Sequence, residues 1–264
     1  MKKRFSVAIA GMVAAISVLF VSSCDDYLFP CIYGNGVLET ESRSMPVFNT
    51  ISLTNSFNVI IVQDSVYKVV VEAEETIVPY VLTGIIGNNL VIKNRDNYCL
   101  RETLPVVIYV HTPKVSKLLL SGSGYMSSDS ISTDEFTAVI TGSGNIEIEK
   151  IYSENTDAVV SGSGYIKMDY LETETVDAKI SGSGMIKMKG KAFESDLTIS
   201  GSGDIRNSDL EHQYADVRIT GSGSAWVYAT KSLNATITGS GNVYYKGSPE
   251  IYVNISGSGR VIKM

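Results

Sequence analysis

The chain has 264 residues, 44% of them hydrophobic, with 28 acidic and 22 basic side chains and a formal net charge of −6. This acidic balance argues against nucleic acid and anionic lipid surfaces as partners, because both attract basic proteins. The length is sufficient to bury a continuous core in one elongated domain.

The N-terminus is typical of an exported lipoprotein. Three cations at positions 2–4 precede an apolar run over residues 5–21, and two serines then lead into Cys24. A charged start, a short apolar middle and small residues before a cysteine differ from a membrane span, which needs about 20 apolar residues. The sequence therefore predicts a signal peptide over residues 1–23 and acylation of Cys24, which would anchor the chain to a membrane by lipid. An ordinary signal peptide or an uncleaved anchor is the alternative.

Removal of the signal peptide makes the chain more acidic. Without the cations of residues 2–4, 19 of the 22 basic residues remain against 28 acidic residues, which gives a formal net charge of −9. Asp25 and Asp26 directly follow the cysteine and resemble the acidic tethers that route some lipoproteins outward. The expected location is the outer membrane, on either its cell-surface or its periplasmic face.

Residues 24–45 are predicted to be a tether without a core. Gly34-Asn35-Gly36 is typical of a turn, and polar residues follow it over positions 39–44. The region 46–120 carries β-prone runs without a regular repeat, and no Pro/Gly/Ser linker divides it from the region that follows. We expect residues 46–120 to form irregular first coils and an N-terminal cap on the repeats described below.

Two cysteines remain once Cys24 is acylated. Cys31 and Cys99 are predicted to form a disulfide, since an exported compartment is oxidising. Two buried free thiols are the alternative, because sequence alone does not bring two residues within bridging distance. With so few cysteines, and with His111 and His212 as the only histidines, no metal site is expected, and no cofactor either.

A four-residue phrase, Ser or Thr followed by Gly-Ser-Gly, organises residues 121–264. Its eight copies begin at Ser121, Thr141, Ser161, Ser181, Ser200, Thr220, Thr238 and Ser256. Successive copies are 18 to 20 residues apart, and so short and regular a period indicates a solenoid.

The residues around the phrase predict which solenoid this is. The first and third residues before it are apolar in every copy, as at Ile180 and Ala178, so the segment alternates as a strand does. A helix is excluded because two glycines in each phrase would each cost about 1 kcal/mol relative to Ala in a helix interior. The sequence predicts an all-β, single-stranded parallel β-helix with coils of about 20 residues. Gly-Ser-Gly is expected at a tight corner where a Cβ does not fit, with the corner serines stacked in a hydroxyl ladder.

The sequence also resembles a known family. Tandem Ser-Gly-Ser-Gly-x-Ile units, such as Ser161–Ile166 and Ser181–Ile186, follow a Phe-Asn-Val-Ile-Ile strand at Phe57–Ile61. These motifs are similar to the head GIN domain family, a domain of unknown function compared with auto-transporter adhesins, over roughly residues 46–264. The resemblance implies a right-handed single-stranded β-helix in lipid-anchored exported proteins of Gram-negative bacteria, and it implies no chemistry. The lipobox in place of a C-terminal barrel argues against secretion through the protein's own pore.

One outward column stands out as a candidate binding surface. The third residue after the phrase is cationic or aromatic in five consecutive copies, and we call this set the stripe. It consists of Lys167, Lys187, Arg206, Trp226 and Tyr244. Aromatic and cationic residues in a row are suited to bind a glycan or a protein. The alternative is an ordinary solvated face whose charge is balanced by nearby glutamates.

A polysaccharide-processing enzyme is the competing function, since some β-helix proteins cleave glycans with paired carboxylates on adjacent coils. Immediately after the phrase only Asp204 is acidic, and two positions later only Glu147. We therefore expect no two carboxylates on neighbouring coils. The predicted function is a lipid-anchored, non-catalytic adhesin-like protein that binds or scaffolds a glycan or protein. Self-association or a protein partner is expected at the open edge of the last coil.

Overall fold

The computed structural model describes residues 29–264. The predicted signal peptide and Cys24 lie outside the described residues. Within them, strands dominate, and the chain forms a β-solenoid of about seven turns with coils of about 20 residues, which confirms the predicted fold class. None of the described segments forms a helix long and apolar enough to cross a membrane.

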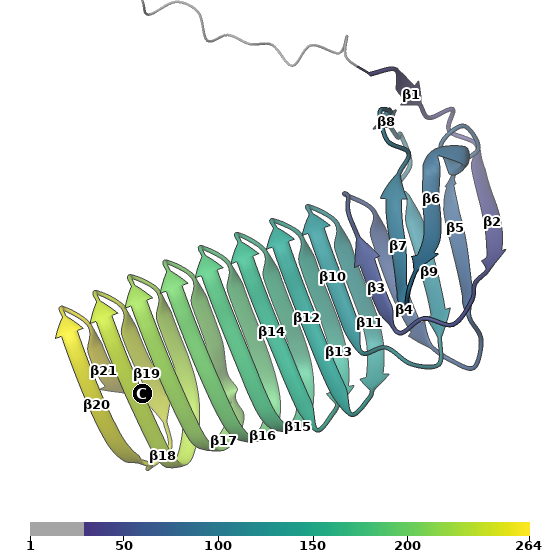
Figure 1. Cartoon of the computed structure of the whole chain (residues 1–264). Coiled ribbons are helices and arrows are strands. Elements are labelled where there is room, and N and C mark those ends of the chain that lie inside the picture. The colour runs from purple at the N-terminus through teal and green to yellow at the C-terminus, as the bar shows by residue number, and fades with distance from the viewer. Residues whose placement is uncertain (1–28) are drawn as a thin grey trace, which may run out of the picture.

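The repeats build a straight stack of parallel strands (Figure 1). The early coils use two strands each, from Tyr165 to Gly239 one strand runs continuously from corner to corner, and the last full coil is again divided into two strands. The strands are β10 (Lys117–Gly122), β11 (Tyr125–Ser132), β12 (Glu135–Gly142), β13 (Asn145–Tyr152), β14 (Asn155–Gly162), β15 (Tyr165–Gly182), β16 (Met185–Gly201), β17 (Asp204–Gly221), β18 (Ser224–Gly239), β19 (Asn242–Lys246), β20 (Glu250–Gly257) and β21 (Arg260–Lys263). Each coil pairs in parallel register with the next, so equivalent residues form columns.

The core is made of inward columns of aliphatic side chains. Ile140, Val160, Ile180 and Ile199 occupy one such column, directly before the corner, and each is at most 1% exposed. Because the inward side chains of each coil cover those of the coil below, the hydrophobic contact is continuous along the solenoid axis.

Glycine is required at the corners by the coil beneath. Gly162 has φ of 130°, and a Cβ there would collide with the carbonyl oxygen of Gly142. A Cβ on Gly164 would lie 2.6 Å from Cγ2 of Ile140. Both glycines of the phrase are therefore dictated by the neighbouring coil.

The corner serines stack through their backbone. The amide of Ser163 donates to the carbonyl oxygen of Gly142 at 2.9 Å, and the other corners repeat this bond. The serine hydroxyls are exposed and form no ladder with one another in the described chain, so the predicted side-chain ladder is wrong. Water satisfies a hydroxyl at the surface, and the backbone amide, which points along the stack, makes the bond between coils.

Residues 46–120 continue the stack and then close it. The strands β3 (Thr50–Leu53) and β4 (Asn58–Gln63) form a coil in register with β10 and β11. The next layer consists of β7 (Asn89–Asn94) and β9 (Val107–Thr112), which pair in parallel with β3 and β4.

Antiparallel strands then form the cap. The strand β5 (Lys68–Glu74) pairs with β9, β6 (Val81–Ile86) pairs with β7, and a short 3-10 helix, η1 (Val78–Tyr80), joins β5 to β6. Antiparallel pairing ends the uniform parallel winding of the solenoid.

The predicted tether over residues 24–45 is wrong for its described part. Residues 31–44 contain β1 (Cys31–Tyr33) and β2 (Leu38–Ser44), and β2 pairs antiparallel with β5 along its full length. The segment lacks an apolar face, but its backbone groups satisfy the open edge of β5, and backbone pairing does not depend on apolar side chains.

Candidate functional site

The stripe forms one column on the outer face of the wall that follows the corner. The register pairs Lys167 with Lys187, Lys187 with Arg206, Arg206 with Trp226, and Trp226 with Tyr244. All five side chains project from strands β15–β19, whose inward neighbours are locked in the core. The spacing along the column is that of stacked parallel strands, about 4.8 Å.

The aromatic end of the stripe is a continuous stack. The guanidinium carbon of Arg206 lies 5.2 Å from the ring centroid of Trp226. The rings of Trp226 and Tyr244 are stacked with centroids 5.0 Å apart and an interplanar angle of 13°. Both faces of the indole are therefore covered, and a ligand meets the ring edges and the guanidinium rather than an open aromatic platform.

The cationic end differs from residue to residue in how its charge is balanced. Lys167 pairs with Asp169 and lies 3.7 Å from Glu147, and the hydrogen bond to Asp169 is the largest cause that raises the pKa of Lys167. Arg206 pairs with Asp204 at 3.1 Å. Lys187 makes no ion pair within residues 29–264, although it lies between two other cations.

A hollow lies beside Lys187. Its volume is about 350 Å³, and it is lined by Lys187, Arg206, Ser208, Asp209 and Trp226. Asp209, which lines the hollow, forms an ion pair of 3.1 Å with Lys246.

Irregular strand register creates this hollow. Between β16 and β17 the register shifts by one residue at Lys187/Lys189, and between β17 and β18 the three residues 208–210 have no counterpart. The coil of β17 therefore bulges over a shorter neighbour. Bulges re-aim side chains and occur preferentially near binding and catalytic sites.

A second column, on the opposite wall, overturns one expectation from the sequence. Asp157, Asp177, Asp196 and Asp216 are paired in register, four residues before their phrases. Carboxylates do stack on neighbouring coils, so the expectation of no such pair is wrong. The expectation rested on the outward positions after the phrase, whereas the aspartates lie at an outward position before it.

The aspartate column is partly neutralised in place. Lys179 pairs with Asp177, and Arg218 pairs with Asp196 at 2.8 Å and with Asp216 at 3.0 Å. Burial, and then the charge of Asp177, raise the pKa of Asp157, while burial is the main cause that raises the pKa of Asp216. No group of three or more His, Cys, Asp or Glu side chains in the described chain is arranged to hold a metal ion.

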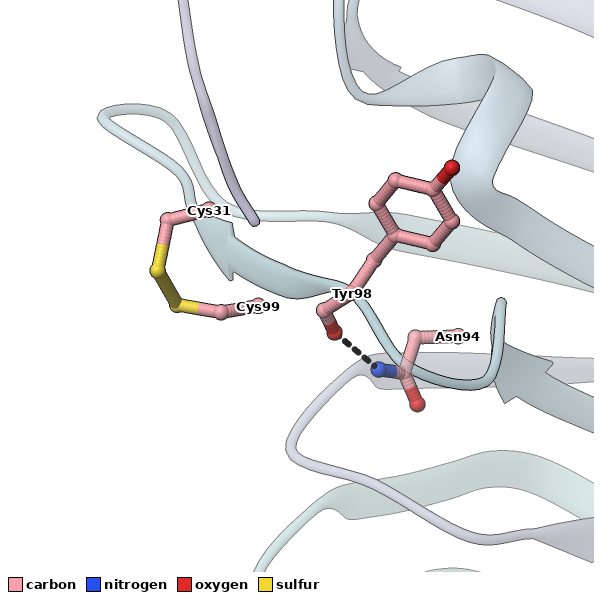
Figure 2. The surroundings of a disulfide bond; sticks show 4 residues. All are labelled: Cys31, Asn94, Tyr98 and Cys99. Carbon is pink, nitrogen blue, oxygen red and sulfur yellow. Dashed lines mark hydrogen bonds between the residues drawn. A yellow bond between two sulfur atoms is a disulfide. The ribbon is translucent and has the colours of Figure 1, made fainter. Parts of the chain in front are cut away.

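The N-terminal strand is fastened to the cap. Cys31 and Cys99 form a disulfide with their Cα atoms 4.2 Å apart, at the start of the two-stranded pairing of β1 with β8 (Cys99–Arg101). Figure 2 shows the disulfide beside the turn in which the side-chain amide of Asn94 donates to the carbonyl of Tyr98 at 3.1 Å. The bond closes a loop with a sequence separation of 68 residues. Because it restricts the unfolded chain, the chain-entropy model predicts that it stabilises the folded protein by about 4 kcal/mol.

Glu74 is a buried carboxylate that the sequence did not single out. It is 0% exposed and accepts hydrogen bonds from the amide of Gly36 at 2.7 Å and from the amide and hydroxyl of Thr103 at 2.7 and 2.6 Å. These bonds, chiefly that from the Thr103 hydroxyl, lower its pKa to about 2. A Cβ on Gly34 would collide with the carboxylate, so the Gly-Asn-Gly turn wraps around it.

The two histidines are structural. His212 is 1% exposed, its Nδ1 lies 3.1 Å from the hydroxyl of Ser195, and burial lowers its pKa to about 4. His111 lies on the cap, where its Nδ1 is 2.8 Å from Asp64. The two occupy separate coils and share no ligand set.

A match to a family model identifies the family of proteins to which this chain is related. The model described as "Putative auto-transporter adhesin, head GIN domain" matches residues 47–169 and again residues 146–249. The chain belongs to this family. The resemblance inferred from the Ser-Gly-Ser-Gly units is thereby confirmed, and the two overlapping matches are in keeping with the repeated coils of this head GIN domain protein.

Solved structures of similar proteins share the fold. A "putative lipid binding protein" from Parabacteroides distasonis is 27% identical with a TM-score of 0.83, and a "putative adhesin" from Parabacteroides merdae is 25% identical with the same score; each match covers 89% of this chain and 99% of the other. A "putative adhesin" from Bacteroides fragilis, 22% identical with a TM-score of 0.68, covers 88% of this chain and 100% of its own and supports the fold alone. No curated protein matches the chain.

Proposed function

We propose that this head GIN domain protein is a lipid-anchored, exported, adhesin-like module that binds or scaffolds and does not catalyse. The observation that carries the proposal is the stripe, a column of cationic and aromatic side chains held in register on a rigid wall, with one unpaired cation beside a hollow. The description of relatives as adhesins or as a lipid-binding protein supports a binding role.

The anchoring side of the proposal concerns the N-terminus. Acylation of Cys24, seven residues before Cys31, would tether the protein at its cap end, because the disulfide fastens this segment to the cap. The stripe would then stand away from the membrane, along the body of the rod. The expected location is the outer membrane, on its surface or periplasmic face.

A binding array tests the proposal. The mature chain should retain ligands on an array of glycans and proteins, and a variant that combines Lys187→Ala, Arg206→Ala and Trp226→Ala should lose at least about tenfold in affinity, since two charge-assisted contacts and an aromatic contact disappear. The matched control removes three outward side chains from the opposite wall: Thr198→Ala, Asn234→Ala and Thr236→Ala. Equal binding by both variants, or no ligand for the unmodified chain, would contradict the proposal.

The aspartate column gives the enzyme alternative a specific test. Asp157 has a raised pKa and lies in register beside a second carboxylate, that of Asp177. Enzymes that cleave glycans by acid–base chemistry use such a pair. The mature chain should show no turnover of acidic or neutral polysaccharides. Turnover that disappears with Asp157→Asn, or with Asp204→Asn or Glu147→Gln, would replace the binding proposal by catalysis.

A further inference from the structure

We infer that the hollow beside Lys187 binds the carboxylate of an acidic saccharide, a sugar chain that contains hexuronic acid. The inference rests on the proposed binding function and names the ligand class for the same surface. It is argued from the charges, the bulge and the polar lining of the hollow.

The first argument is an uncompensated cation. Lys187 is half-buried and is flanked in its column by Lys167 and Arg206, which both have carboxylate partners, whereas Lys187 has none in the described chain. Like charges on adjacent rungs repel each other. An anion between Lys187 and Arg206 would relieve this repulsion and accept charge-assisted hydrogen bonds from both.

The second argument is the composition of the rest of the hollow. Asp209 and Ser208 line it together with the two cations, and both belong to the bulge at residues 208–210. A carboxylate accepts hydrogen bonds only, so Asp209 selects a ligand that also carries donors, such as sugar hydroxyls. A simple inorganic anion offers no donor to Asp209, whereas a sugar carboxylate flanked by hydroxyl groups provides an acceptor for the two cations and donors for Asp209.

The third argument is the shape of the aromatic wall. Arg206 and Tyr244 cover the two faces of the Trp226 indole, so a sugar ring cannot stack on it and contacts its edge. Affinity must then come mainly from the charged contacts. The ligand's carboxylate is therefore the essential group, and neutral saccharides are expected to bind poorly.

Trp226 supplies a built-in reporter. It is the single tryptophan of the 264 residues, and it lines the hollow. Fluorescence excited selectively at the indole, outside the absorption of the fifteen tyrosines, consequently reports on this site. The probe is an oligogalacturonate of defined length, and its matched control is the same oligosaccharide with every carboxylate methyl-esterified, which keeps the hydroxyls and removes the charge.

The expected result is a saturable change in Trp226 fluorescence with the free acid and at least tenfold weaker binding of the ester. Lys187→Gln should weaken binding of the free acid at least tenfold and leave the ester unaffected. Lys150→Gln, which removes an exposed cation outside the stripe, should change binding less than twofold. Circular dichroism melts of both variants establish that they fold as the unmodified chain does.

Four outcomes would overturn the inference: equal binding of acid and ester, an unchanged affinity in Lys187→Gln, binding by calorimetry without any change in Trp226 fluorescence, or binding of phosphatidylglycerol vesicles in place of the saccharide. The first three leave the proposed function intact when the stripe variant loses other ligands on the array. If the stripe variant keeps every ligand that the unmodified chain binds on the array, both proposals are refuted.

Discussion

The corner glycines show how one residue's requirements come from the coil next to it. At Gly162 two demands coincide: a φ of 130°, which L side chains rarely adopt, and a carbonyl oxygen of Gly142 in the place of a Cβ. A substituent cannot escape by choosing another rotamer, because Cβ itself collides.

We predict that Gly162→Val lowers the free energy of unfolding by about 4 kcal/mol or more, since it adds backbone strain to a steric clash in the stack. Ser163→Ala, one residue along in the same corner, should change it by less than about 0.5 kcal/mol, because the exposed hydroxyl makes no bond between coils. Urea denaturation of both variants measures the difference. Similar midpoints for the two would contradict the assignment of the corner.

The spacing of residues alone was enough to predict the corners, the inward columns and the stacking of the stripe positions. In a regular repeat, residues at the same distance from the phrase occupy the same position on every coil. The same logic applied to the position four residues before the phrase would have found Asp157 and Asp177. Glu74 was beyond reach, since its partners at Gly36 and Thr103 come from segments with no repeat. The hollow depends on bulges that a spacing of 18 to 20 residues does not locate within a coil.

At the scale of elements, the cap shares the apolar core of the repeats, and polar contacts fasten its first segment in addition. Glu74, at the end of β5, binds the turn before β2 and the loop after β8 through the amides of Gly36, Thr103 and Leu104. The disulfide joins the same two segments. These contacts should make the stability of the cap depend on pH, through Glu74, and on redox conditions, through the disulfide.

We predict two acid-sensitive contributions to stability. In the unfolded chain the Glu74 carboxyl has its ordinary pKa of 4.5, whereas in the folded protein its pKa is about 2, so its stabilisation is complete above pH 4.5 and is lost between pH 4.5 and 2. Buried His212 resists protonation until about pH 4, while the unfolded side chain is protonated below 6.5, so its contribution falls between pH 6.5 and 4.

The measurement is the free energy of unfolding as a function of pH. Glu74→Gln should be less stable at neutral pH and should show a smaller fall between pH 4.5 and 2, of which Asp64 and Asp169 with their lowered pKa values retain a part, whereas Glu75→Gln, at the exposed neighbouring position, should keep the whole fall. A curve for Glu74→Gln parallel to that of the unmodified protein would show that this carboxylate does not set the acid response.

The whole molecule has two unlike ends. At the cap, edge strand β2 is rich in charge, and Arg43 reaches across to donate to the carbonyl of Val81 and the hydroxyl of Thr83 on β6, the other edge strand. Charged edges and covered ends prevent strand addition. At the opposite end, the outer edges of β20 and β21 pair with no strand of the described chain, and Ile251, Val253 and Ile255 are 38 to 49% exposed.

We propose that the β20–β21 end pairs with the same end of a second copy. A two-fold axis across the two walls would place β20 antiparallel to its copy and β21 likewise, which satisfies both edges and covers the exposed side chains in one contact. The mature chain should therefore sediment as a concentration-dependent dimer. Val253→Lys should shift it to monomer, because a lysine would then be buried without a partner at the centre of the contact.

The matched control is Thr236→Lys, which adds the same charge on the exposed outer face of β18, one coil back. It should dimerise as the unmodified chain does, since its side chain lies outside the stacked end. A chain that is monomeric at every concentration, or a Val253→Lys variant that still dimerises, would show that this edge is used for another partner or for none. Because the proposed axis lies at the far end from the Cys31–Cys99 disulfide, the two caps of such a dimer would lie at its opposite tips.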